Sequence, residues 1–342
     1  MSAPKPLALT LGEPAGIGPD LTLALWRRRA EVDLPPFYLI GDADFLRRRA
    51  RTLGFDVALA EVTPGEAVSV YPRALPVVSL GLSINTKPGE PDATSAPAAI
   101  AAIRRAVDDV MAGQAAGMVT NPIAKSVLSR AGFAEPGHTE FLGHLAEQAT
   151  GKPVTPVMML WARELAVVPV TIHIPLREVF STLSTALIVD TGRIVARDLS
   201  RRFGVAQPRL AVAALNPHAG EEGTLGDEDE LIVAPAVAKL RAEGIDAVGP
   251  LPADTLFHER ARATYDAALC MYHDQALIPI KTLAIDHGVN VTLGLPFVRT
   301  SPDHGTAFDL AGTGKANPGS LLAAIRLAAR LTANAPALVP AK

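Results

Sequence analysis

Cysteine is almost missing from this chain of 342 residues, and its scarcity limits the chemistry available. With Cys270 alone, no internal disulfide can form, which fits a reducing compartment, so we expect a cytoplasmic protein. Cys270 lies inside an apolar run, and we interpret it as an inert core thiol. A catalytic nucleophile at this position is the less favoured alternative.

Long apolar runs and long basic runs are also missing. No apolar stretch reaches the ~18 residues that a membrane-spanning helix requires, and the amino terminus shows no signal-peptide pattern. The net charge is −3, and no long basic run appears, so we expect neither a membrane nor a nucleic acid as a partner. Hydrophobic residues make up 49% of the chain, which is typical of a globular protein, and its length predicts roughly two domains.

Apolar, strand-like runs alternate with helical patterns along most of the chain. This alternation predicts an α/β protein with a mainly parallel sheet covered by helices. The first strand, 7–11, runs into a glycine-rich loop, 12–20, and then a helix, which is the order found in phosphate-binding turns. However, the loop matches neither the dinucleotide fingerprint nor the Walker pattern, so a simple tight turn is an equally good interpretation. Residues 248–255 are expected to form an irregular connector.

Three histidines each follow their own apolar run. His173 follows 165–172, His218 follows 210–215, and His273 follows the run that begins at Ala267. In α/β sheets, ligands collect at the carboxyl ends of strands, and three imidazoles with open coordination positions suit Zn²⁺ and related divalent ions in catalytic sites. We therefore predict one shared metal site, provided that the fold brings the three histidines together. A structural or surface role for each histidine is the alternative.

Other polar residues suggest a site for an anionic ligand. Lys281, Asn290 and Arg299 lie within 26 residues of His273, and the last two are expected at strand ends. Lysine and arginine supply charge for phosphate or carboxylate, and arginine can bind either through two parallel hydrogen bonds. Farther upstream, Thr139 is expected to cap a helix, whereas His138 has no such structural explanation.

A stretch near the carboxyl terminus resembles a known cofactor loop. Residues 303–312 resemble the loop with which isopropylmalate and isocitrate dehydrogenases hold the adenosine part of their nicotinamide cofactor. This likeness makes four residues candidates for cofactor binding: His304, Gly305, Asp309 and Gly312.

Taken together, the motifs resemble the family of 4-hydroxythreonine-4-phosphate dehydrogenases, relatives of those β-decarboxylating enzymes. The stretches that carry the resemblance occur in family order over nearly the whole chain: 12–19, 137–141, 171–176, 215–221, 271–275 and 288–301. The resemblance implies a two-domain α/β/α fold like that of isocitrate and isopropylmalate dehydrogenases, with mostly parallel sheets and an interdomain cleft. It places the cofactor-side domain at 1–120 plus 281–342. The domain for the metal, the substrate and dimerisation would span 121–280.

The resemblance also implies an activity and a set of roles. The enzyme would use NAD or NADP to oxidise 4-phosphohydroxy-L-threonine, and the product would lose CO₂ to give 3-amino-2-oxopropyl phosphate. His173, His218 and His273 would bind one divalent metal, Zn²⁺, Mg²⁺, Co²⁺ or Mn²⁺, and a homodimer would share its active sites between subunits. Lys281 and His138 would be catalytic candidates. The residues implied to contact this phosphorylated substrate are His138, Thr139, Lys281, Asn290 and Arg299.

Three alternatives stay open from the sequence. A sister dehydrogenase acting on 4-phospho-D-erythronate or 4-phospho-D-threonate would share every ligand named above. A metal-dependent hydrolase could use the same three histidines and would bind no nicotinamide cofactor. A non-catalytic binding protein with an inherited fold is the least favoured, because none of the three histidines nor Lys281 is missing.

Overall fold

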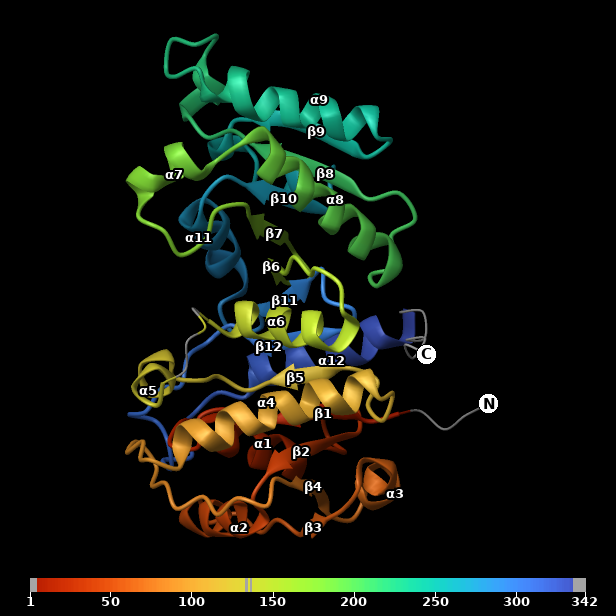
Figure 1. Ribbon diagram of the computed structural model, residues 1–342, viewed down its shortest axis with the longest axis vertical. Coiled ribbons are helices and arrows are strands. Elements are labelled where there is room, and N and C mark those ends of the chain that lie inside the picture. Colours follow the sequence, from red (N-terminus) through yellow and green to blue (C-terminus); the bar gives the residue numbers. More distant parts are fainter. Residues whose placement is uncertain (1–4, 133–134, 136, 335–342) are drawn as a thin grey trace. The chain divides into compact units, whose positions relative to one another are not determined.

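The computed structural model describes residues 5–132, 135 and 137–334 (Figure 1). The chain divides into two compact units, which we treat separately. Unit 1 comprises Met1–Pro156 and Leu295–Lys342, and unit 2 comprises Val157–Gly294. The domain limits expected from the sequence, 1–120 plus 281–342 and 121–280, stay a prediction.

Unit 1 contains a parallel run of strands in the order β3-β4-β2-β1-β5-β12. The inner strands are continuous apolar runs buried on both faces, as expected where helices cover both sides of a parallel sheet. The strands are β1 (Leu7–Thr10), β2 (Phe37–Gly41), β3 (Leu59–Glu61), β4 (Leu75–Ser79), β5 (Met118–Thr120) and β12 (Arg299–Pro302).

The helices of unit 1 pack their apolar faces on this sheet. The long helix α4 is rich in alanine, which favours helix formation and lets it lie close to β1 and β2. Its buried alanines share a core cluster with Phe141 and Leu142 of α6, which runs beside α4 (Figure 1). The helices are α1 (Gly18–Arg27), α2 (Ala43–Thr52), α3 (Ala67–Val70), α4 (Ser95–Met111), α5 (Lys125–Arg130), α6 (His138–Thr150) and α12 (Gly319–Asn334).

Unit 2 contains a mixed sheet in the order β11-β6-β7-β10-β8-β9. Strands β7, β10, β8 and β9 are parallel to one another, whereas β6 is antiparallel to both β11 and β7. The strands are β6 (Val157–Trp161), β7 (Ala166–Pro169), β8 (Arg209–Ala213), β9 (Asp246–Leu251), β10 (Ala267–Cys270) and β11 (Val289–Leu293). The helices are α7 (Leu176–Thr182), α8 (Thr185–Arg201), α9 (Ala234–Ala242), α10 (Glu259–Arg262) and α11 (His273–Ala284).

The α/β architecture with a mostly parallel sheet is confirmed, and one local expectation is wrong. Residues 246–251 form strand β9, which pairs with β8, rather than the start of an irregular connector. Gly249 and Pro250 suggested a loop, but β9 ends the strand order, and an edge strand tolerates a proline because one side of it needs no donor. The burial expected for Cys270 is confirmed, since its side chain is enclosed in the core of unit 2 and burial raises the pKa of the thiol.

No single helix in the described ranges is long and apolar enough to cross a membrane. Helices α7 and α8 together would be long and apolar enough, but they are bent by 93° relative to each other.

Candidate active site

The topology of unit 2 brings the loops of the three predicted metal ligands to one edge of the sheet. β7, β10 and β8 are neighbouring parallel strands in that order, so their carboxyl ends lie on the same side. His173 follows β7, His273 begins α11 directly after β10, and His218 lies in the turn after β8. The strand-end placement of all three histidines is therefore confirmed.

Two of these three histidines lie close together. The ring centroids of His173 and His273 are 5.7 Å apart, and both rings line a pocket of about 250 Å³ with Leu176 and Val179 of α7. His218 is not among the residues that line this pocket. Within the described ranges, no group of three histidine, cysteine, aspartate or glutamate side chains is arranged to hold a metal ion. The shared metal site therefore stays a prediction.

A network that the sequence did not reveal holds the loop of His218. His218 and Ala219 both have positive φ angles, 53° and 56°, a left-handed conformation that side chains other than glycine adopt at a cost. At the base of this loop, the main-chain N–H groups of Leu215 and Asn216 donate to the Asp229 carboxylate at 2.7 and 2.9 Å. Asp229 is only 1% exposed, so this acid anchors the loop besides beginning the following helical turn.

His273 has a carboxylate neighbour that orients its ring. Its Nδ1 lies 2.7 Å from Oδ1 of Asp274, which leaves Nε2 for another partner. Lys281 lies farther along the same helix, α11. The sequence pattern did not predict this helix. Asn290 is the second residue of β11, so it lies near the beginning of a strand rather than at its end. Strand β11 is separated from β10 by β6 and β7 in the sheet order.

In unit 1, two of the predicted substrate residues, Arg299 and His138, contact each other. Arg299 is 3% exposed, and its Nε and Nη2 donate to Oγ1 of Thr120 at 3.1 and 2.7 Å. Its Nη2 also lies 3.4 Å from Nδ1 of His138. Arg299 is the first residue of β12, not the last, but its long side chain reaches the carboxyl end of β5.

Burial and charge shift the pKa values of this pair. Burial lowers the pKa of Arg299 to about 9, because the guanidinium loses its hydration. Burial also lowers the pKa of His138 well below its usual value, and the Arg299 charge lowers it further. The imidazole is therefore neutral at physiological pH, and an anion bound here would stabilise the buried guanidinium.

Thr139 is not the helix cap that the sequence suggested. It is the second residue of α6, and Gly137 occupies the cap position. A Cβ at Gly137 would lie 2.7 Å from Oε2 of Glu140, so the flexible Glu140 side chain would have to move to admit one. Thr139 therefore lies in the first helical turn, where unpaired main-chain N–H groups favour anions.

Among the described residues, several buried polar atoms at this edge of unit 1 have no hydrogen-bond partner. An unsatisfied buried polar group costs about 1–3 kcal/mol, so a cluster of them indicates a place where a ligand supplies partners. The sequence did not single out Thr10 or Glu13, because only the fold shows that they are buried. In strands β1, β5 and β12 and the segments beside them, the atoms are Thr10 Oγ1, Glu13 Oε2, Asn121 Oδ1, His138 Nε2 and His304 Nε2.

The four predicted cofactor residues lie on the loop after β12. Nδ1 of His304 lies 3.0 Å from the main-chain oxygen of Gly305, while Gly305 and Asp309 are exposed. The N–H of Gly312 donates to Oδ2 of Asp20 at 2.6 Å. The loop is therefore fixed at Gly312 and open to solvent at Gly305 and Asp309. The role of these four residues in cofactor binding stays a prediction.

The glycine-rich loop 12–20 is a buried turn. The N–H groups of Glu13, Ala15, Gly16 and Ile17 all donate to acceptors within the protein. A Cβ at Gly16 would lie 2.9 Å from the main-chain oxygen of Thr306, so glycine is required for close packing. Of the two interpretations left open by the sequence, the structure favours the tight turn, because these amides are not available to a phosphate.

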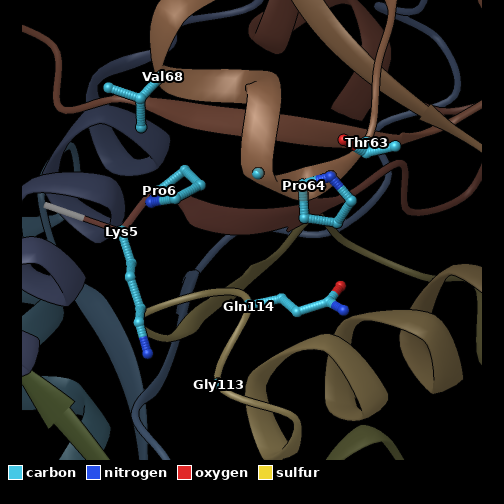
Figure 2. Close-up of a pocket in the computed structure, with 8 residues that line it drawn as sticks. Lys5, Pro6, Thr63, Pro64, Val68, Gly113 and Gln114 are labelled. Atoms are coloured by element: carbon cyan, nitrogen blue, oxygen red, sulfur yellow. The ribbon is translucent and has the colours of Figure 1, made fainter. Parts of the chain in front are cut away.

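A second pocket, of about 440 Å³, lies at the opposite end of the unit 1 strands (Figure 2). Lys5 and Pro6 precede β1, and Gly113 and Gln114 precede β5, so the pocket lies at the amino ends of these strands. It contains none of the predicted site residues. Its lining consists of Lys5, Pro6, Thr63, Pro64, Gly65, Val68, Gly113 and Gln114.

Parallel strands that deliver polar side chains at their carboxyl ends define an α/β protein of the kind that binds small ligands at that edge. The family model described as "Pyridoxal phosphate biosynthetic protein PdxA" matches residues 33–328. The chain belongs to this family. The curated relatives that it matches are named as dehydrogenases.

Named relatives and solved structures agree with this assignment. The chain is 63% identical over 339 residues to a 4-hydroxythreonine-4-phosphate dehydrogenase of Bradyrhizobium diazoefficiens, a match covering 97% of this chain and 98% of the relative. It resembles the crystal structure of the Klebsiella pneumoniae enzyme of that name with a TM-score of 0.85 and 40% identity, covering 97% and 99% of the two chains.

A more distant neighbour carries another name. A terephthalate 1,2-cis-dihydrodiol dehydrogenase of Burkholderia xenovorans is 29% identical, with a TM-score of 0.65, covering 96% of this chain and 98% of that one. The same fold therefore occurs in a dehydrogenase named for another substrate.

Proposed function

We propose that the chain is an NAD(P)-dependent 4-hydroxythreonine-4-phosphate dehydrogenase of pyridoxal phosphate biosynthesis. It oxidises 4-phosphohydroxy-L-threonine to 2-amino-3-oxo-4-phosphooxybutanoate, which loses CO₂ to give 3-amino-2-oxopropyl phosphate. Family membership over residues 33–328 is the observation that carries the proposal. We place the enzyme in the cytoplasm, since its single cysteine forms no internal disulfide.

His173, His218 and His273 would hold one divalent metal ion. The donor set fits this role, because three imidazoles follow adjacent parallel strands and Asp274 leaves Nε2 of His273 free to ligate. A bound ion would lower the pKa of the substrate hydroxyl and ease its deprotonation. Imidazole ligands accept Zn²⁺, Co²⁺ or Mn²⁺, and Mg²⁺ is a further candidate.

Arg299 and His138 would bind the phosphate or the carboxylate of the substrate. An anion would stabilise the charge of the buried guanidinium, and the neutral imidazole can donate through Nε2, which has no partner among the described residues. Thr139, in the first turn of α6, would add a hydroxyl at a position favourable for anions. Lys281 and Asn290 complete the proposed substrate contacts, and Lys281 is also the candidate general base.

NAD or NADP would accept the hydride from the substrate carbon. His304, Gly305, Asp309 and Gly312 would hold the adenosine part of this cofactor. Within the part of the chain that the structure describes, the buried Nε2 of His304 has no hydrogen-bond partner, which fits an atom that binds a ligand.

The active form would be a homodimer whose subunits share their active sites. Leu176 and Phe180 of α7 are 62% and 51% exposed, and Ile278 of α11 is 64% exposed. Both helices contribute residues to the pocket of His173 and His273. Apolar side chains at such positions favour contact with a second copy of the chain.

A substrate panel tests the proposed activity. Purified protein with added Co²⁺, Mn²⁺, Zn²⁺ or Mg²⁺ is mixed with NAD⁺ or NADP⁺ and 4-phosphohydroxy-L-threonine, and reduced cofactor is measured at 340 nm. We expect reduction that exceeds the rate with 4-phospho-D-erythronate or 4-phospho-D-threonate. Faster turnover of a sugar acid would favour the sister dehydrogenase. Phosphate release without cofactor reduction would favour a hydrolase.

A further inference from the structure

Two buried residues outside the proposed ligand set connect two loops of unit 1. Arg49 of α2 and Asp20 of α1 form an ion pair, with Nη1 of Arg49 2.5 Å from Oδ1 of Asp20. The two residues are 2% and 3% exposed. Because an ion pair loses its hydration when it is buried, its geometry and additional hydrogen bonds decide whether it is stable.

Those additional hydrogen bonds all go to main-chain groups of loops at the carboxyl edge of the sheet. Arg49 donates through Nη1 to Gly16 O at 3.2 Å and through Nη2 to Pro14 O at 2.6 Å. The second carboxylate oxygen of Asp20 accepts the N–H of Gly312 at 2.6 Å. One ion pair therefore fixes the glycine-rich loop on one side and the loop after β12 on the other.

The loops also contact one another directly. The N–H of Ile17 donates to Thr306 O at 3.0 Å, and the N–H of Gly89 donates to Ala15 O at 2.8 Å. A Cβ at Gly312 would lie 2.8 Å from Cβ of Pro88, so Gly312 packs against the proline ring without room for a side chain. The glycine-rich loop, whose amides at Glu13, Ala15, Gly16 and Ile17 donate within the protein, thus serves as a packing surface for residues 304–312.

We propose that Arg49 and Asp20 are positioning residues that hold the 304–312 loop in the conformation that binds the nicotinamide cofactor. This inference rests on the proposed function, because His304, Gly305, Asp309 and Gly312 are its cofactor residues. Both members of the ion pair are buried, so the pair is not exposed to a ligand in solution. It acts through the position of the Gly312 amide and through the support that Gly16 and Ile17 give to Thr306.

Three variants separate positioning from general stability. The first pairs Arg49→Met with Asp20→Asn, which removes both charges and so leaves no unpaired buried charge. The second, Arg49→Lys, keeps the charge but cannot reproduce the guanidinium bonds to Gly16 O and Pro14 O. The control is Asp109→Asn, which alters another carboxylate buried in unit 1, held by Tyr38 and Arg105 at 2.7 and 2.8 Å.

The readout is cofactor binding measured by fluorescence titration with NAD⁺ and NADP⁺, alongside steady-state kinetics. We expect the paired variant to raise the cofactor Kd at least tenfold and Arg49→Lys to raise it about threefold, with kcat at saturating cofactor changed by less than about twofold. The Asp109→Asn control should keep the wild-type Kd. Hydrogen exchange should be faster in residues 304–318 of the paired variant and unchanged there in the control.

The outcomes distinguish this inference from the proposed function. Failure of the wild-type protein to bind either cofactor would overturn both. Wild-type binding together with an unchanged Kd in Arg49→Lys or in the folded paired variant would overturn the positioning role alone. If the paired variant does not fold, Arg49→Lys decides the question by itself. An equal rise in Kd for the Asp109→Asn control would show that the loop responds to any loss of stability, which also rejects the inference.

Discussion

The two units both place candidate functional residues at an edge of a sheet, but they differ in how completely the protein itself holds those residues. In unit 1, Arg299 is buried and contacts Thr120 and His138, whose Nε2 has no hydrogen-bond partner among the described residues. In unit 2, His173 and His218 are exposed, and only His173 and His273 lie close to each other. Under the proposed function, unit 1 would hold a preorganised anion site, and the metal site proposed for unit 2 would be completed by the ion itself and by a second copy of the chain.

The largest loss of activity should come from removing one ligand of the metal site proposed for unit 2. Replacing His218 by Ala should lower metal-dependent turnover by a factor on the order of 10³ or more, because two imidazoles cannot retain a catalytic ion. The circular dichroism spectrum should stay that of the wild type, since His218 is exposed. Activity measured in metal-stripped protein with added metal checks this. Full turnover by the variant would remove His218 from the site.

A smaller loss is expected in the preorganised site. Arg299→Gln removes the buried cation and should lower kcat/KM for the phosphorylated substrate by roughly 10²–10³, the cost of one partner in a buried charge pair. Steady-state kinetics over a range of substrate concentrations measures the change. Arg330→Gln is a control, because it removes an exposed arginine of α12 in the same unit. Equal losses in both variants would mean that Arg299 matters for stability and not for the anion.

Adding metal should stabilise unit 2 and leave unit 1 nearly unchanged. At a metal concentration one hundred times the dissociation constant, the gain is about 2.7 kcal/mol for a single site. Hydrogen exchange should therefore slow in residues 171–175 and 216–222, the segments that carry His173 and His218. Protection that appeared first in residues 118–121 of unit 1 would contradict the contrast between the units.

The smallest effect concerns the pH dependence of unit 1. His138 has a lowered pKa in the folded protein, so below pH 6.5 only the unfolded chain takes up its proton. Stability from this group is present above pH 6.5 and is lost as the pH falls below that value. Between pH 6.5 and 5.5, the wild type should lose about 1 kcal/mol more than His138→Gln.

Urea unfolding at the two pH values measures this difference. His144→Gln is the matched control, because His144 lies on the same helix but is exposed. It should keep the wild-type dependence on pH. A control that behaved like His138→Gln would show that burial of His138 is not the cause.

The sequence alone predicted the parts of the site that depend on local patterns. Apolar runs that stop at His173, His218 and His273 located the ends of β7, β8 and β10, and one cysteine inside such a run was correctly taken as buried. These positions follow from periodicity within a few residues, which is visible without knowing the fold.

Parts that depend on distant partners could not be predicted in this way. Gly16 is required because its backbone packs against Thr306, which is far away in the chain. Asp229 anchors the loop of His218 because it accepts the main-chain N–H groups of Leu215 and Asn216, which follow β8. Nothing in the order of residues distinguishes Asp229 from the acids beside it. Strand β9 was missed because its Gly-Pro pair is read as a turn until its place at the edge of the sheet is known.

The metal content of the protein tests the central claim most directly. Wild-type protein is stripped with a chelator, titrated with Co²⁺ or Zn²⁺ and analysed by mass spectrometry of the bound metal, beside His173→Ala, His218→Ala and His273→Ala. Our account predicts one ion per chain in the wild type and a loss of at least tenfold in affinity for each variant. An unchanged affinity in any of the three variants would contradict a single ion held by all three imidazoles.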